Sequence, residues 1–140
     1  MSVKEALRLD GFLSIEVWRM AFIEGWGTFL LIVVVGAGAS ALASITDAPI
    51  ATTLYGALLN LVALTLFIFT AAPASGGHLN PTITMATFFA GLCTLPRAVL
   101  YIVAQSVGGI VGGYWLRLGL GDAYFSQVSD SSRELLAASL

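Results

Sequence analysis

The chain alternates between long apolar stretches and short polar segments, a pattern that predicts helices crossing a membrane. Apolar residues dominate 17–43, 49–72 and 97–118. Each range is close to the roughly 20 residues that a helix needs to span about 30 Å of hydrocarbon. We therefore predict three transmembrane helices over these ranges, the second without any charged residue.

A fourth apolar piece, residues 81–92, is too short to span the hydrocarbon and is typical of a re-entrant segment. Asn80 is a favourable helix cap, and Pro81 suits the first helical position. Gly91 and Pro96 bracket the end of the piece. We predict a loop and half-helix over 73–92, between the second and third spans.

Charge predicts the orientation. With the N-terminus inside, four basic residues fall inside and two outside, which favours a cytoplasmic N-terminus by the positive-inside rule. Residues 1–16 are predicted to be a cytoplasmic lead-in, with a weakly amphipathic helix and no signal peptide. Residues 119–140 are expected to be a polar tail after the channel-like part at 17–118. The inside set is Lys4, Arg8, Arg19 and Arg97, and the outside set is Arg117 and Arg133.

Composition fits an all-α integral membrane protein. The chain is 58% hydrophobic and 10% charged, with a mean hydropathy of +0.92, whereas soluble domains carry about 25% charged residues. The net charge of −2 and the absence of a basic patch argue against a nucleic-acid partner. Cys93, the single cysteine, fits no metal pattern. No nucleophile–base pair or cofactor loop occurs, so neither an enzyme nor a cofactor is predicted.

The polar segment SGGHLNPTIT, residues 75–84, lies between two apolar spans. Backbone inside a bilayer must face protein or water, so a loop here implies a pore lining. The carbonyls of Gly76, Gly77 and His78 can form a row of acceptors, and the Asn80 amide can donate beside Pro81 and Thr82. Such a lining suits a neutral solute that forms hydrogen bonds. The alternative is an ordinary loop with an Asn cap on a surface helix.

Three residues inside the spans are further candidates for the site, namely Glu24, Asn60 and Gln105. Glu24 is a carboxylate in the first span, and we expect it to brace the loop through backbone N–H groups, His78 or Gln105. A proton-relay role for Glu24 is the alternative. Asn60, midway along the second span, either bonds to a neighbouring helix or lines the pore. Helix packing is predicted at the paired small residues Gly108, Gly109, Gly112 and Gly113.

The segment at 75–84 resembles the first signature of the major intrinsic proteins, the aquaporins and aquaglyceroporins, usually written SGxHxNPAVT. Thr82 stands where alanine is usual. EGWGT at 24–28 is similar to the family's AEFxGT, and YIVAQSVGG at 101–109 is similar to its YxxAQxxGA. The three motifs occur in the family's order and spacing across residues 20–113.

The resemblance implies one half of an inverted-repeat fold, with three spans and one re-entrant half-helix. It implies a channel for water and for glycerol or other small neutral solutes. By this resemblance Asn80 is a pore asparagine, Gly76, Gly77 and His78 supply carbonyls, and Glu24 braces the loop. Counting back from Asn80 places the filter position of the second span at Asn60, where water-selective members carry a bulky aromatic residue.

The sequence holds one Asn-Pro repeat, whereas the family's filter arginine follows a second. We therefore expect a half-length or truncated homologue in a lipid bilayer. It would pair with copies of itself, with a second-half chain or with a full-length homologue, and the family implies a tetramer. The alternative function is a non-conducting interaction subunit that needs such a partner.

Overall fold

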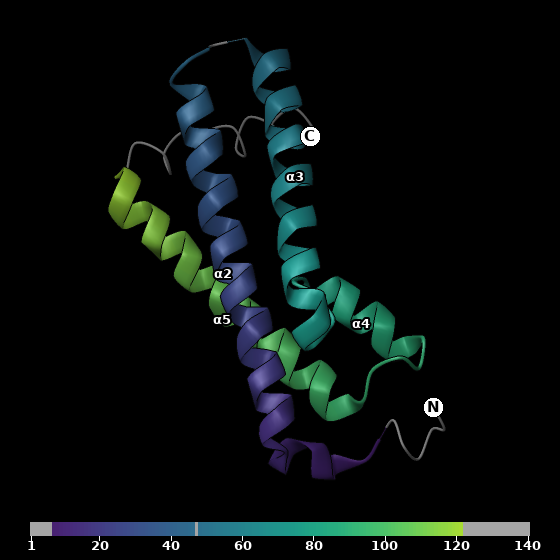
Figure 1. The fold of residues 1–140 in the computed structure, drawn as a ribbon. Helices are drawn as coiled ribbons and strands as arrows, with labels where there is room; N and C mark the ends of the chain where they lie inside the picture. Colours follow the sequence, from purple (N-terminus) through teal and green to yellow (C-terminus); the bar gives the residue numbers. More distant parts are fainter. Residues whose placement is uncertain (1–6, 47, 122–140) are drawn as a thin grey trace, which may run out of the picture.

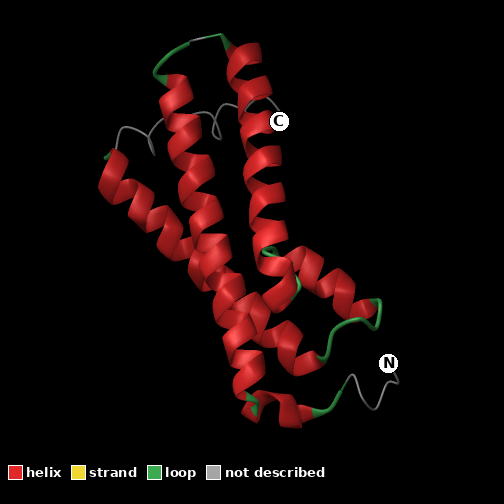
Figure 2. Ribbon diagram, viewed as in Figure 1, coloured by secondary structure: helices red, strands yellow, loops and turns green. Residues whose placement is uncertain are grey.

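In the computed structural model, which describes residues 7–46 and 48–121, every regular element of the described chain is a helix (Figure 2). The three long helices are each apolar enough to cross a membrane. The predicted all-α membrane fold, with three spans and a short helix between the second and third, is confirmed. The elements are η1 (Leu9–Leu13), α2 (Ile15–Ala43), α3 (Pro49–Ser75), α4 (Pro81–Phe89) and α5 (Leu95–Leu120).

Helix α2 is the centre of the bundle. It packs against both α3 and α5, as Figure 1 shows: α3 runs back alongside α2, and α5 crosses α2 at an angle. The short helix α4 projects sideways from the end of α3 and packs against α5. The segment between α3 and α4 therefore lies part-way along α2, near the place where α5 crosses it.

The helix ends differ from the apolar pattern by a few residues, for local reasons. Helix α3 continues past Ala72 and through Pro73 to Ser75, because its stop is Gly76 in the left-handed conformation, with φ 101°. Helix α5 begins at Leu95, and Pro96 lies in its first turn, where a missing N–H costs nothing. Helix α4 ends at Phe89, three residues before the predicted end of the half-helix.

Within the predicted lead-in, the described residues form a short 3-10 helix, η1. The indole N–H of Trp18 donates to the carbonyl of Phe12 at 2.9 Å, which fixes the turn between η1 and α2. Gly11 lies against Pro96, so η1 and the start of α5 share one end of the bundle. The predictions for residues 1–6 and for the tail beyond Gly121 lie outside the described residues.

Two of the four paired glycines of α5 lie where α2 approaches most closely. A Cβ at Gly108 would overlap the carbonyl oxygen of Gly25, and one at Gly112 would lie 3.1 Å from the Phe29 carbonyl oxygen. A Cβ at Gly109 or at Gly113 would instead meet no neighbouring atom of the described chain within 4 Å. The contact between α2 and α5 thus depends on glycines from both helices, which allow backbone to approach backbone.

Candidate functional site: the re-entrant loop

Between α3 and α4 the chain reverses through backbone conformations that few residues adopt. Gly76, Gly77 and Leu79 have φ values of 101°, 65° and 50°. A Cβ at Gly77 would lie 2.8 Å from the carbonyl oxygen of Ile68, so the loop is pressed against the backbone of α3. Leu79 is not a glycine, and its positive φ carries strain that the surroundings must offset. The loop therefore needs strong contacts to hold its shape.

The Glu24 carboxylate supplies those contacts from α2. Its Oε1 accepts from the Ser75 hydroxyl at 2.6 Å and from the His78 backbone N–H at 3.0 Å. Its Oε2 accepts from the Leu79 backbone N–H at 2.5 Å and from the Gln105 amide at 2.9 Å. Glu24 is fully buried, and a buried charge is tolerated only when it is fully hydrogen-bonded. The carboxylate meets loop N–H groups and Gln105, as the sequence suggested, and it meets His78 through its backbone, not its ring.

The depth of this cluster follows from the position of Glu24. At about 1.5 Å per residue, Glu24 lies about 14 Å along α2 from Ile15 and about 29 Å from Ala43. The loop bonded to it therefore lies about a third of the way along α2. Helix α2 is apolar and long enough to cross a membrane, so the loop is bonded to a position within a candidate membrane span.

A second set of hydrogen bonds connects the loop to α4 and α5. The Gln105 amide also donates to the Thr84 hydroxyl at 3.1 Å, and the same hydroxyl bonds the Asn80 carbonyl at 3.0 Å. The His78 ring Nδ1 lies 3.2 Å from the Thr84 hydroxyl, and the ring packs edge-on against Tyr101. These bonds fix the direction in which α4 leaves the loop. No grouping of metal-ligating side chains occurs among the described residues.

Asn80 and the first turn of α4 remain open. The Asn80 side-chain oxygen accepts from the Thr82 backbone N–H at 2.8 Å, so the asparagine caps the helix, and Pro81 follows at the first position. Asn80 and Thr82 are exposed. Among the described residues, no hydrogen bond reaches the Asn80 amide nitrogen or the carbonyl oxygens of Gly76, Gly77 and His78. The loop thus carries free acceptors and one free donor.

Asn60 is exposed on α3, about 22 Å along the helix from Ser75. Its side chain forms no hydrogen bond with any other described residue, and the cluster around Glu24 does not include it. Cys93 is buried after α4, where its thiol donates weakly to the Thr94 carbonyl at 3.6 Å. Burial raises the pKa of the Cys93 thiol, so that side chain stays neutral.

One face of α5 supplies most of these contacts, and the sequence motif at 101–109 included its Tyr101 and Gln105 but not Arg97. Arg97 and Tyr101 precede Gln105 by two turns and one turn, and both donate to the Ser75 carbonyl. Residues 97, 101 and 105 follow one another at a four-residue spacing, which places them on one face of a helix, and this spacing could have identified Arg97. Further along, the same face contacts α2 through Gly108, Gly112 and Leu116.

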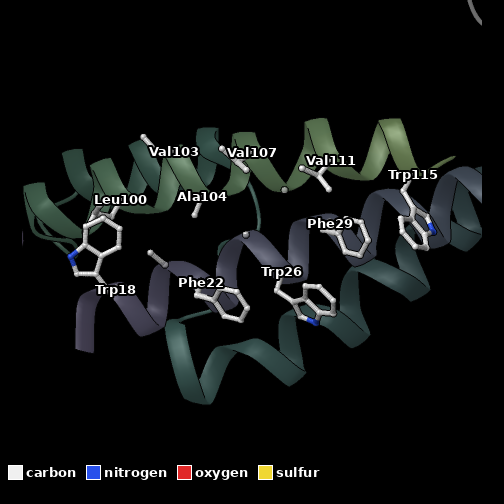
Figure 3. A pocket seen from close by; sticks show the side chains of 13 residues that line it. Trp18, Phe22, Trp26, Phe29, Leu100, Val103, Ala104, Val107, Val111 and Trp115 are labelled. Atoms are coloured by element: carbon white, nitrogen blue, oxygen red, sulfur yellow. The ribbon is translucent and has the colours of Figure 1, made fainter. Parts of the chain in front are cut away.

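A second concave feature lies on the outer side of α2 and α5. It is an apolar groove of about 720 Å³ (Figure 3). Phe22 and Trp26 line it, about 160° around α2 from Glu24 at about 100° per residue. Apart from indole N–H groups, its side chains offer no hydrogen bonds to water. The groove is therefore unsuited to a polar solute, and it is separate from the loop. Its larger side chains include Trp18, Phe22, Trp26, Phe29, Val107 and Trp115.

Comparison with known proteins agrees with this architecture. The sequence profile of the family described as Major intrinsic protein matches residues 12–137. Aquaporin-5 of Mus musculus is 36% identical over 114 residues, which cover 76% of this chain and 40% of the mouse protein. Aquaporin PIP2-1 of Arabidopsis thaliana is 47% identical over 47 residues, covering 34% of this chain and 16% of the plant protein. No solved structure matches the chain.

The fold and the loop define an integral membrane protein with several spans and a re-entrant segment. The chain belongs to the major intrinsic protein family. Membership places it in a family of water channels, not among enzymes. The chain spans 40% or less of the length of these relatives.

Proposed function

We propose that this chain forms half of the lining of a passive pore for water. The observation that carries the proposal is the loop after α3, which is braced deep in the bundle while its outward groups stay free. The free groups are the carbonyls of Gly76, Gly77 and His78 and the amide nitrogen of Asn80. A water molecule that leaves bulk solvent must replace its hydrogen bonds, and this row of acceptors and a donor offers replacements.

Selection against ions follows from the same groups. Asn80 caps the N-terminus of α4, and a helix N-terminus carries a positive partial charge. Cations and protons are repelled there, whereas a neutral molecule is not. Helix α4 is only 9 residues long, so the partial charge of its N-terminus acts at short range, beside the Asn80 amide. Passage then requires no conformational change and no energy source.

The proposed solute range includes glycerol and other small neutral molecules. The wider solute range is supported by Asn60, which by family resemblance occupies a filter position where water-selective members carry a bulky aromatic residue. Its side chain is polar and exposed on α3. Such a side chain leaves a wider constriction with hydrogen-bonding capacity for solute hydroxyl groups.

The proposed orientation has the N-terminus in the cytoplasm. Arg8, Arg19 and Arg97 lie at the end of the bundle formed by η1 and the starts of α2 and α5, whereas Arg117 lies at the other end of α5. This asymmetry agrees with the positive-inside rule. The loop would then approach the membrane interior from the cytoplasmic side.

The proposed pore also needs a partner. Gly76, Asn80 and Thr82 are exposed, His78 is half-buried and Gly77 is buried, and polar groups facing hydrocarbon cost several kcal/mol each. A second copy of this chain or a chain carrying the matching repeat would cover them and form the opposite wall. The same exposed face supports the second candidate function, a subunit that conducts only after a separate chain has docked on it.

We expect two substitutions of Asn80 to separate its capping role from its pore role. Asn80→Asp keeps the oxygen that accepts from Thr82 but removes the amide donor, and Asn80→Ala removes both. The aspartate variant should fold as stably as the wild type and lose most water flux, because a carboxylate attracts cations and cannot donate. The alanine variant should also lose about 1 kcal/mol of stability. Stopped-flow light scattering of proteoliposomes and thermal unfolding in detergent check both expectations.

For Asn60 we expect an effect on selectivity rather than on folding. Asn60→Phe adds bulk at an exposed position with no hydrogen-bonded partner in the described chain. Glycerol flux should fall several-fold relative to water flux, while the unfolding temperature stays within a few degrees of wild type. Leu58→Phe, an exposed apolar position two residues away, is the matched control and should leave the ratio unchanged. An equal ratio in both variants would remove Asn60 from the pore.

A further inference from the structure

Among the described residues, Arg97 is the only charged side chain besides Glu24 that is hydrogen-bonded to the segment from Ser75 to Leu79, and the sequence motifs do not account for Arg97. We propose that Arg97, with Tyr101, is a positioning residue for the pore loop, holding the Ser75 carbonyl while Glu24 holds the loop N–H groups. The expected effect of Arg97 on water flux rests on the proposed pore function. The geometry that supports the positioning role concerns the loop alone.

The Ser75 carbonyl needs a partner because the chain reverses after it. In a continuing helix this oxygen would accept from the N–H of residue 79. The Leu79 N–H instead donates to Glu24 at 2.5 Å. The guanidinium of Arg97 and the hydroxyl of Tyr101, the latter at 2.5 Å, donate to the Ser75 oxygen in its place. The reversal is thus stabilised at both of its ends, at the Ser75 carbonyl and at the Leu79 N–H.

The two side chains also hold each other. Arg97 Nε donates to the Tyr101 hydroxyl at 2.9 Å, and the guanidinium carbon lies 5.1 Å from the centre of the tyrosine ring. Tyr101 is fully buried, so its ring is a fixed support. A planar guanidinium can stack on the ring and donate in two directions at once, whereas an ammonium group lacks this geometry. Arg97 is therefore set in one position relative to Ser75.

The charge of Arg97 suits this place. Ser75 is the last residue of α3, and a helix C-terminus carries a negative partial charge that a cation stabilises. The guanidinium also borders the lining, because a Cβ at Gly76 would lie 3.3 Å from Arg97 Nη2 and 3.5 Å from the His78 ring. Movement of Arg97 would accordingly shift the first carbonyls of the row that the solute meets.

The test compares Arg97→Gln, Arg97→Lys and Tyr101→Phe in the full chain, reconstituted in vesicles. Hydrogen–deuterium exchange at residues 76–79 reports the loop directly. We expect Arg97→Gln to raise exchange there about tenfold, the effect of losing a charge-assisted hydrogen bond, with no change at residues 30–35 of α2. Tyr101→Phe keeps the ring and should show a smaller rise in the same residues. Arg97→Lys should recover part of the protection.

Arg19→Gln is the matched control, since Arg19 is exposed and pairs only with the exposed Glu16; it should leave loop exchange unchanged. Unaltered exchange at 76–79 in Arg97→Gln, or an equal rise throughout the chain, would overturn the positioning role. Water flux is measured on the same vesicles and should fall about tenfold in Arg97→Gln. A wild-type chain without flux would refute the pore, while the exchange result would still decide the role of Arg97.

Discussion

Glu24→Gln is expected to abolish water flux and to cause one of the two largest losses of stability among single substitutions in this chain. The glutamine has nearly the same shape, but one of its two carboxylate oxygens becomes an NH₂ group. Two of the four donors that now face Glu24 would then face another donor. Each unsatisfied buried donor costs about 1–3 kcal/mol. Thermal unfolding in detergent and vesicle permeability measure the two effects.

The strained Leu79 makes this loss specific to the loop. Its φ of 50° is held by the bond from its N–H to Glu24 and by the bond from the Thr28 hydroxyl to its carbonyl at 3.3 Å. Without the carboxylate, the loop is expected to relax toward ordinary backbone angles and to withdraw its carbonyls from the pore. Glu16→Gln is the control: it breaks only an exposed ion pair with Arg19, worth about 0.5 kcal/mol or less. A Glu24→Gln chain that unfolds and conducts like wild type would contradict the bracing role.

Gly108→Ala is expected to separate α2 from α5, while Gly109→Ala is expected to be harmless. The added methyl at Gly108 would overlap the carbonyl oxygen of Gly25, and backbone cannot rotate away as a flexible side chain can. Such overpacking costs about 1–3 kcal/mol. At Gly109 the methyl meets open space, so the higher helix propensity of alanine adds up to about 1 kcal/mol of stability. The unfolding temperatures of the two variants should move in opposite directions.

This pair of variants also tests whether the position of each glycine on α5, and not glycine content alone, determines the packing of α5 against α2. Both changes add one methyl group to adjacent positions of the same helix, so differences in hydrophobicity cancel. If both variants unfold at the same temperature, the close approach of α2 and α5 is not a source of stability. Water flux in Gly108→Ala should fall with stability, since Gln105 lies one turn before Gly108 and reaches Glu24 from this interface.

The sequence predicted the elements that depend on local pattern. Apolar length located the three spans, and Asn80 with Pro81 located the start of α4, because capping and propensity act within a few residues. The bracing role of Glu24 was also predictable, since a carboxylate inside an apolar span must find hydrogen-bond donors. Its bonds to the loop N–H groups and to Gln105 follow from that need.

What the sequence could not provide depends on how closely particular backbones approach in space. Nothing local in Gly25 marks it as the surface that Gly108 meets. The positive φ of Leu79 is unexpected for leucine, and it is held by contacts with distant residues, Glu24 at the N–H and Thr28 at the carbonyl. The role of Arg97 at the Ser75 carbonyl depends on the reversal that removes that oxygen's helical partner. Of the paired glycines, only Gly108 and Gly112 contact α2, a choice set by the crossing of α5.

The central claim, that the loop after α3 lines a water pore, is tested most directly by osmotic shrinkage of vesicles carrying the purified chain. Empty vesicles and vesicles with Asn80→Asp, which keeps the helix cap, are measured beside them. The account predicts water flux well above that of empty vesicles for the wild type and near the empty level for Asn80→Asp. Equal flux in wild-type and empty vesicles, or flux that Asn80→Asp leaves unchanged, would contradict it.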